Sequence, residues 1–86
     1  MRIWGKIWKQ NRLLRDEVYE EISDDTRTHK IFRGLEALCT SFDLSVPIWL
    51  DATVDEFKRL GKTRFYQDHF IEKIDFDYLE IHIIEE

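Results

Sequence analysis

The sequence predicts a single α+β domain, residues 1–86, with two helices on one face of a small three-stranded antiparallel sheet, in the order β-β-α-α-β. Three observations lead to this class: residues 2–20 have the pattern of a hairpin, residues 23–44 and 53–61 have apolar side chains at helical spacing, and residues 74–86 alternate like a strand. With 86 residues, 43% of them hydrophobic and 14% aromatic, the chain is long enough for one core and too short for two.

The first segment, RIWGKIWKQN at residues 2–11, fits two structures. As a helix, its two isoleucines and two tryptophans would form one broad apolar stripe. A strand is favoured because Gly5 would weaken a helix interior and because isoleucine and tryptophan favour strands. Gln10-Asn11 then has the composition of a tight turn, since asparagine tolerates a positive φ. We therefore expect a β-hairpin.

The second strand of this hairpin is RLLRDEVYEE, residues 12–21. Its alternation suggests that Leu14 and Val18 face the helices, while Arg15, Glu17 and Tyr19 face the other way.

The stretch from Ser23 to Leu44 is the clearest helix. Ser23, Asp24 and Asp25 are residues that cap helix starts. Its inward side chains recur at helical spacing and are Ile31, Leu35, Leu38 and Phe42.

The second helix covers residues 53–61. Thr53 and Glu56 have the spacing of a capping box, and Gly61 is placed to end the helix. Pro47, in the link before it, excludes a central strand there. Residues 62–73 fit either another helical turn or an ordered loop.

Charge predicts how the strands are arranged. Residues 1–15 carry five basic side chains and no acidic one, and residues 74–86 carry five acidic side chains and no basic one. Opposite charges across neighbouring strands stabilise a sheet. The last strand is therefore expected beside the first, in the order 2-1-3. The alternative has the last strand in the middle of the sheet.

Net charge, cysteine content and the length of apolar runs also limit the class of function. A net charge of −5 argues against general binding to nucleic acid or anionic lipid. The single cysteine, Cys39, cannot form an internal disulfide, which fits a reducing cytoplasm. No apolar run approaches the ~18 residues of a membrane span, and the N-terminal segment lacks the apolar core of a signal peptide. We therefore expect a cytoplasmic domain that does not enter a membrane.

Four segments resemble a known family: THKIF, FDLSVPIWLD, KTRF and IDFDYLEI, in that order and spacing. They are similar to small uncharacterised proteins of anaerobic Gram-positive bacteria, and the likeness covers almost the whole chain. The resemblance implies a compact cytoplasmic α+β domain and a hairpin at residues 2–20. The family has no assigned activity, so no functional residue is transferred.

The sheet face turned away from the helices is the main candidate site. An open face with several aromatic side chains is unusual for a monomer. Tryptophan, tyrosine and arginine are frequent anchors of protein interfaces, so we expect a surface for a protein partner or a second copy of the chain. Two alternatives remain: the rings stack on nucleic-acid bases, or residues 62–73 or the stems of lysine and arginine cover them. The predicted partner-binding residues are Trp4, Lys6, Trp8, Arg15, Tyr19 and Tyr78.

A basic cluster of Lys58, Arg59, Lys62 and Arg64 is the second candidate. Four cations at a helix C-terminus are favourable to the helix dipole, which is the structural interpretation. The functional alternative is an anion or nucleic-acid binding site. No glycine-rich phosphate loop accompanies it.

No motif in the sequence predicts catalysis, a metal or a cofactor. His69 lies among acidic residues, but their spacing matches no metal motif. Cys39 and His29 are ten helical positions apart, about 15 Å along a helix axis, too far for a nucleophile–base pair. We therefore expect no enzyme. Small size and acidity also permit an antitoxin-like inhibitor of a basic partner.

Overall fold

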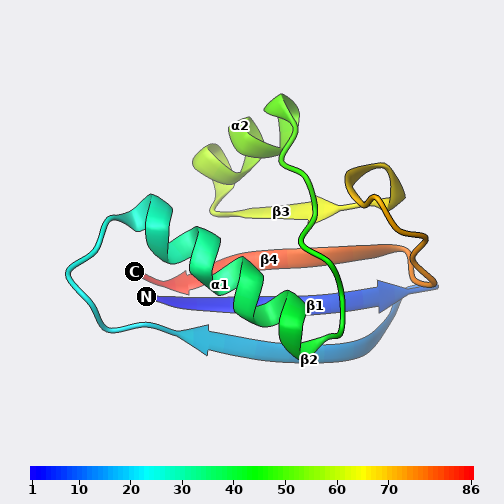
Figure 1. Cartoon of the computed structure of the whole chain (residues 1–86), viewed down its shortest axis with the longest axis horizontal. Helices are drawn as coiled ribbons and strands as arrows, with labels where there is room; N and C mark the ends of the chain where they lie inside the picture. The colour runs from blue at the N-terminus through cyan, green and yellow to red at the C-terminus, as the bar shows by residue number, and fades with distance from the viewer.

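The computed structural model describes residues 1–86 and contains four strands, two helices and one short 3-10 helix (Figure 1). In chain order the elements are β1 (Arg2–Lys9), β2 (Arg12–Glu20), α1 (Arg27–Ser41), α2 (Asp51–Leu60), β3 (Lys62–Phe65), η1 (Gln67–His69) and β4 (Tyr78–Glu85). The strands form one antiparallel sheet in the order β2-β1-β4-β3. No helix is long and apolar enough to cross a membrane.

The predicted three-stranded sheet is wrong, because KTRF at residues 62–65 forms a fourth strand beside β4. Four residues are too few for alternation to identify a strand in a sequence. The strand begins directly after Gly61, whose φ of 69° ends α2 as predicted. The last strand does lie beside the first, since β4 pairs with β1. The predicted order 2-1-3 is nevertheless wrong about its position: β4 is an inner strand between β1 and β3, as the stated alternative had it.

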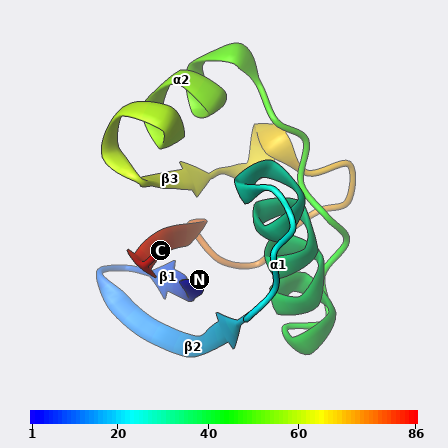
Figure 2. The same ribbon diagram turned by 90° about the vertical axis from the view of Figure 1, so that its left-hand side faces the viewer.

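The position of the second helix also differs from the prediction. Figures 1 and 2 show α1 lying across one face of the sheet, whereas α2 runs alongside β3 at the sheet edge. Trp49 links the two helices: its ring packs edge-on against Phe32 of α1, Phe57 of α2 and Phe65 of β3. The opposite face of the sheet has no helix or loop over it (Figure 2).

The hairpin prediction is confirmed, but the two faces of β2 are reversed. Gln10 and Asn11 both have positive φ, 52° and 63°, as a two-residue turn requires. The resulting register places Tyr19 opposite the inward Ile3 and Val18 opposite the outward Trp4. Leu14 and Val18 are therefore exposed, at 51% and 39%, and do not face the helix.

The core lies between the sheet and α1. At Gly34 the backbone of α1 lies very close to side chains of the hairpin. A Cβ there would lie 2.7 Å from Ile3 Cδ1 and 2.9 Å from a ring carbon of Tyr19, so the glycine allows α1 to approach the hairpin. Cys39 packs into this core, and its burial raises the pKa of the thiol to about 12. The fully buried large side chains are Ile3, Leu35, Leu38, Leu79, Ile81 and Phe65.

Both predicted N-terminal helix caps are wrong. The N-cap of α1 is Thr26, whose hydroxyl accepts the backbone N–H of His29 at 3.2 Å. α2 begins at Asp51, before the expected capping box, and Glu56 instead accepts a hydrogen bond from Thr63 of β3 at 2.9 Å. The carboxylate of Glu56, which the capping-box spacing assigned to the start of α2, therefore binds the neighbouring strand instead.

The expected capping residue Asp25 belongs to an ion-pair cluster that ties α1 to the end of β2. Arg33 Nη1 lies 2.9 Å from Asp25 Oδ2, and Arg33 Nε and Nη2 lie 3.1 and 2.5 Å from the two oxygens of Glu21. Hydrogen bonds from Arg33 hold the pKa of Glu21 well below its usual range. The backbone N–H of Thr26, with His29 and Arg33, lowers the pKa of Asp25 from 3.8 to about 2.

This cluster predicts a loss of stability in acid. Because both carboxyl pKa values are depressed in the folded chain, the unfolded chain takes up protons first, and the stabilisation present above about pH 4 is lost as the pH falls toward 2. Thermal unfolding between pH 7 and pH 2 measures this effect. Arg33→Gln should give a shallower dependence of melting temperature on pH. An equally steep dependence in this variant would contradict the assignment.

Candidate functional site

The sheet face without a helix carries side chains from all four strands. Residues 62–73 do not cover it; residues 62–65 extend it by one strand (Figure 2). We call this surface the open sheet face, and its residues are Trp4, Lys6, Trp8, Leu13, Asp16, Val18, Lys62, Arg64, Tyr78, Glu80 and His82.

The strand register arranges these side chains in three rows that cross the sheet. The rows, in the strand order β2, β1, β4 and β3, are Val18–Trp4–His82–Lys62, Asp16–Lys6–Glu80–Arg64 and Leu13–Trp8–Tyr78. The outer rows hold the aromatic rings, and the middle row alternates in charge. Side chains directly opposite one another on adjacent strands are close enough to interact.

The middle row is centred on Glu80. Lys6 Nζ lies 3.2 Å from Glu80 Oε1, and Arg64 Nε lies 3.1 Å from Glu80 Oε2. These neighbours leave Glu80 only 8% exposed although no element of the chain covers it. Burial by itself raises its pKa, but the hydrogen bonds from Arg64 and Lys6 outweigh burial, and the pKa of Glu80 is lowered. A carboxylate with both oxygens paired therefore holds the two cations in place.

Each cation of this row also lies against a ring of an outer row. Lys6 Nζ is 3.9 Å from the centre of the Trp4 ring, and Arg64 Cζ is 4.6 Å from that of Tyr78. Trp4 Nε1 donates a hydrogen bond of 2.9 Å to Asp16 of β2. Trp4 and Tyr78 are consequently half-buried, and Trp8 is half-buried as well. Lys6 and Arg64 therefore shield the rings of Trp4 and Tyr78 in part. This agrees with the alternative in which lysine and arginine side chains cover the aromatic face.

Trp8 lacks such a partner. Its Nε1 is buried and has no hydrogen-bond acceptor among the protein atoms. Buried polar atoms in folded proteins are normally paired, so this indole nitrogen is a donor left unused within the chain.

Four of the six predicted partner-binding residues lie together on the open sheet face: Trp4, Lys6, Trp8 and Tyr78. The other two face α1. Arg15 donates hydrogen bonds to the carbonyl oxygens of Ser41 and Phe42, at 3.0 and 3.3 Å, and so satisfies the C-terminal end of α1. Tyr19 donates to Glu21 at 2.6 Å, and this hydrogen bond raises the pKa of the tyrosine.

Sequence reasoning did not include Asp16, Lys62 or Arg64 in the site. Asp16 was missed because the two faces of β2 were predicted in reverse. Lys62 and Arg64 were missed because β3 was not predicted. The only signal in KTRF is its alternation: Thr63 and Phe65 are buried, and the two cations between and before them are exposed.

The four cations of the predicted anion site do not gather around one cavity. Lys62 and Arg64 line a cavity of about 440 Å³ between α2 and β3, whereas Lys58 lines a smaller hollow on the other side of α2. Lys58 and Arg59 do lie in the last turn of α2, where they favour the helix dipole.

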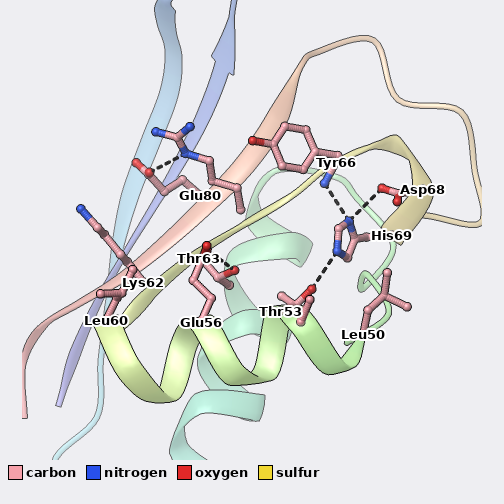
Figure 3. A pocket seen from close by; sticks show the side chains of 12 residues that line it. Leu50, Thr53, Glu56, Leu60, Lys62, Thr63, Tyr66, Asp68, His69 and Glu80 are labelled. Carbon is pink, nitrogen blue, oxygen red and sulfur yellow. Dashed lines mark hydrogen bonds and ion pairs between the residues drawn. The ribbon is translucent and has the colours of Figure 1, made fainter.

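The larger cavity is of mixed charge (Figure 3). Glu56, Asp68 and Glu80 line it together with the two cations. At one end His69 is fixed, with Nδ1 accepting the backbone N–H of Tyr66 at 3.0 Å and Nε2 lying 2.9 Å from the Thr53 hydroxyl. No three histidine, cysteine or acidic side chains are grouped as metal ligands. The cavity therefore presents no concentrated positive charge to an anion.

Comparison of the chain with protein-family models, curated proteins and solved structures finds no match. The resemblance to the small Gram-positive family stays a prediction, as does the absence of enzymatic activity.

Proposed function

We propose that this domain is a protein-interaction module that binds a partner protein through the open sheet face. One observation carries the proposal: two rows of half-exposed aromatic side chains flank a paired row of charges on a face that nothing in the chain covers. Tryptophan, tyrosine and arginine are enriched among the energetic hot spots of protein interfaces.

The charge of this face favours a protein over a nucleic acid. It holds two anions, Asp16 and Glu80, against three cations, and Lys6 and Arg64 are already paired with Glu80. Binding to a phosphate backbone depends on unpaired cations, of which Lys62 alone remains in these rows. The chain as a whole has a net charge of −5. The basic residues 58–64 as a nucleic-acid site remain the alternative.

The ion pairs also prepare the surface for binding. Immobilising a flexible side chain at an interface costs about 0.5–1.5 kcal/mol. Lys6 is already held by Glu80 and Trp4, and Arg64 by Glu80 and Tyr78, so a partner meets these cations in a fixed arrangement.

Replacing both tryptophans tests the proposal. The double variant Trp4→Ser, Trp8→Ser should weaken partner binding by about 2 kcal/mol or more, roughly 30-fold, because it removes two aromatic anchors. The partner is recovered from native lysate on the tagged wild-type chain, purified, and titrated by calorimetry against each variant.

The control is Ile22→Ser, Ile71→Ser, which removes the most exposed large hydrophobic side chains, both of them outside the open sheet face. It should bind like wild type, and circular dichroism should show all variants folded. A folded tryptophan variant with wild-type affinity would reject the proposal. Recovery of nucleic acid in place of protein, with steep salt dependence, would favour the basic alternative.

A further inference from the structure

We infer that an extended peptide segment of another protein binds as an added strand beside β3, in the cavity of about 440 Å³ between β3 and α2. We call this cavity the edge groove; its walls include Thr53, Glu56 and Leu60 of α2 and Lys62, Thr63 and Arg64 of β3. The groove adjoins the open sheet face but uses none of its aromatic rings, so the inference does not depend on the proposed function.

The strand register turns the backbone N–H and C=O groups of Lys62 and Arg64 toward the free edge of β3. In an antiparallel ladder, every second opposed pair exchanges both backbone hydrogen bonds. The N–H of Ile83 donates to the carbonyl oxygen of Gly61 at 2.8 Å, so the odd-numbered residues of β3 are the ones bonded to β4. The backbone groups of the two even-numbered residues therefore point away from the sheet.

The next even-numbered residue confirms this direction. The backbone N–H of Tyr66 points away from the sheet and is accepted by His69 Nδ1 at 3.0 Å. Lys62 and Arg64 have no such arrangement, since no loop, turn or side chain forms a hydrogen bond with their backbone groups. Because folded proteins normally pair their backbone groups, these residues leave two donors and two acceptors for a ligand.

The edge groove lies against these unpaired groups. Lys62 and Arg64 are on the open sheet face and Thr63 is on the helix side, yet all of them line the groove, which must therefore follow the edge of the strand. Figure 3 shows Thr53 and Glu56 of α2 on the opposite wall. The volume is within the range of about 300–1,000 Å³ that is typical of ligand pockets.

The wall formed by α2 determines which kind of strand fits. An edge strand of another sheet carries its neighbouring strands with it, and α2 occupies the place beside β3 that they would need (Figures 1 and 2). A single extended segment has no such neighbours, and its main chain supplies the hydrogen-bond partners that Lys62 and Arg64 lack. Strand addition at a sheet edge is a common mode of peptide recognition.

Charge in the groove favours particular side chains in the segment. Arg64 is paired with Glu80, whereas Lys62 forms no ion pair, so an acidic side chain is favoured opposite Lys62. The next side chain of an extended segment points to the other face, toward α2. There Glu56 accepts a hydrogen bond from Thr63 through Oε1 alone, which leaves Oε2 for a lysine, arginine or hydroxyl group. We therefore expect acidic and hydrogen-bond-donating residues to alternate.

Amide hydrogen exchange of the full wild-type chain, followed by NMR, tests the inference. The probe is a linear peptide selected on the immobilised chain from a phage-displayed random library. In the free chain the amides of Lys62 and Arg64 should exchange much faster than those of Thr63 and Phe65, which are bonded to β4. The bound peptide should slow exchange at Lys62 and Arg64 about tenfold or more, because it pairs with both residues.

Replacing Arg64 with proline tests the same backbone group by substitution. Arg64→Pro removes an N–H that faces away from β4, so circular dichroism should show a folded chain. It should bind the peptide about tenfold more weakly than Arg64→Ala, which loses the same side chain but keeps the N–H. The double variant Trp4→Ser, Trp8→Ser should bind the peptide like wild type.

Three outcomes would overturn the inference: no peptide enriched over an empty support, a bound peptide that leaves exchange at Lys62 and Arg64 unchanged, or a folded Arg64→Pro chain that binds as well as Arg64→Ala. If the proline variant does not fold, the exchange measurement on the wild-type chain decides. A peptide that is lost in the tryptophan variant and gives no protection at Lys62 and Arg64 would reject the edge groove and leave the proposed function standing.

Discussion

Replacing Phe65 with alanine is expected to lower the free energy of unfolding by about 3–5 kcal/mol. The ring is fully buried on β3 and packs edge-on against Trp49 and His69, with ring centres 5.0 and 5.5 Å apart. At roughly 0.05–0.15 kcal/mol per residue, a domain of this length has about 4–13 kcal/mol in total. The variant should therefore unfold at much lower urea concentration, followed by circular dichroism.

Two variants make this prediction specific to the fourth strand. Phe65→Leu keeps most of the volume and should cost less than about 1.5 kcal/mol. Tyr66→Ala changes the next residue, whose ring is 44% exposed, and should cost less than Phe65→Ala. Equal costs for the two alanine variants would contradict the placement of residues 62–65 in the sheet.

Replacing Glu80 with alanine should cost about 2–3 kcal/mol, the second-largest effect. The change leaves Lys6, whose side chain is 13% exposed, without its anion, and removes a partner of Arg64. An uncompensated charge in a desolvated place is strongly destabilising. Chemical denaturation at neutral pH measures the loss.

A double variant distinguishes the effect of the unpaired Lys6 charge from the other effects of replacing Glu80. Lys6→Met with Glu80→Met removes both charges and retains much of the side-chain volume, so it should be more stable than Glu80→Ala. If the double variant is less stable than Glu80→Ala, the unpaired lysine does not cause the loss of unfolding free energy in Glu80→Ala. The ion pairs of Glu80 would then not be what holds Lys6 and Arg64 in place on the open sheet face.

Periodicity and charge predicted the elements that are long or strongly patterned. The hairpin followed from Gly5 and the Gln10-Asn11 turn, and the pairing of β4 with β1 followed from the opposite charges of the two chain ends. The four residues of β3 were missed because a strand of that length contains only two alternations. Its place in the sheet depends on the tertiary contacts of Phe65.

The faces of β2 were reversed for a different reason. The prediction assigned its apolar residues inward, but at the edge of this sheet the inward side chains meet the end of a helix. Arg15 supplies the donors that the last carbonyl groups of α1 need, and Glu17 accepts a hydrogen bond from Ser41. A hydrophobic pattern alone carries no information about such polar partners, which is why two predicted site residues lie on the wrong face.

The core of the candidate site was nevertheless predictable. Trp4, Lys6 and Trp8 alternate along one strand, and Tyr78 follows from the same period on another. Their neighbours Asp16 and Arg64 depend on register and on the missed strand, so only the structure brings the charged row together.

Photo-crosslinking tests the central claim most directly, that the open sheet face meets another protein. A benzoyl-phenylalanine replaces Tyr78 on the open sheet face or, as the control, Phe32, which is 52% exposed on α1. Irradiation of cells expressing each chain is followed by mass spectrometry of the adducts. We expect position 78 to give a discrete adduct with a different protein and position 32 to give none. Adducts with another protein at position 32 but not at 78 would contradict the claim.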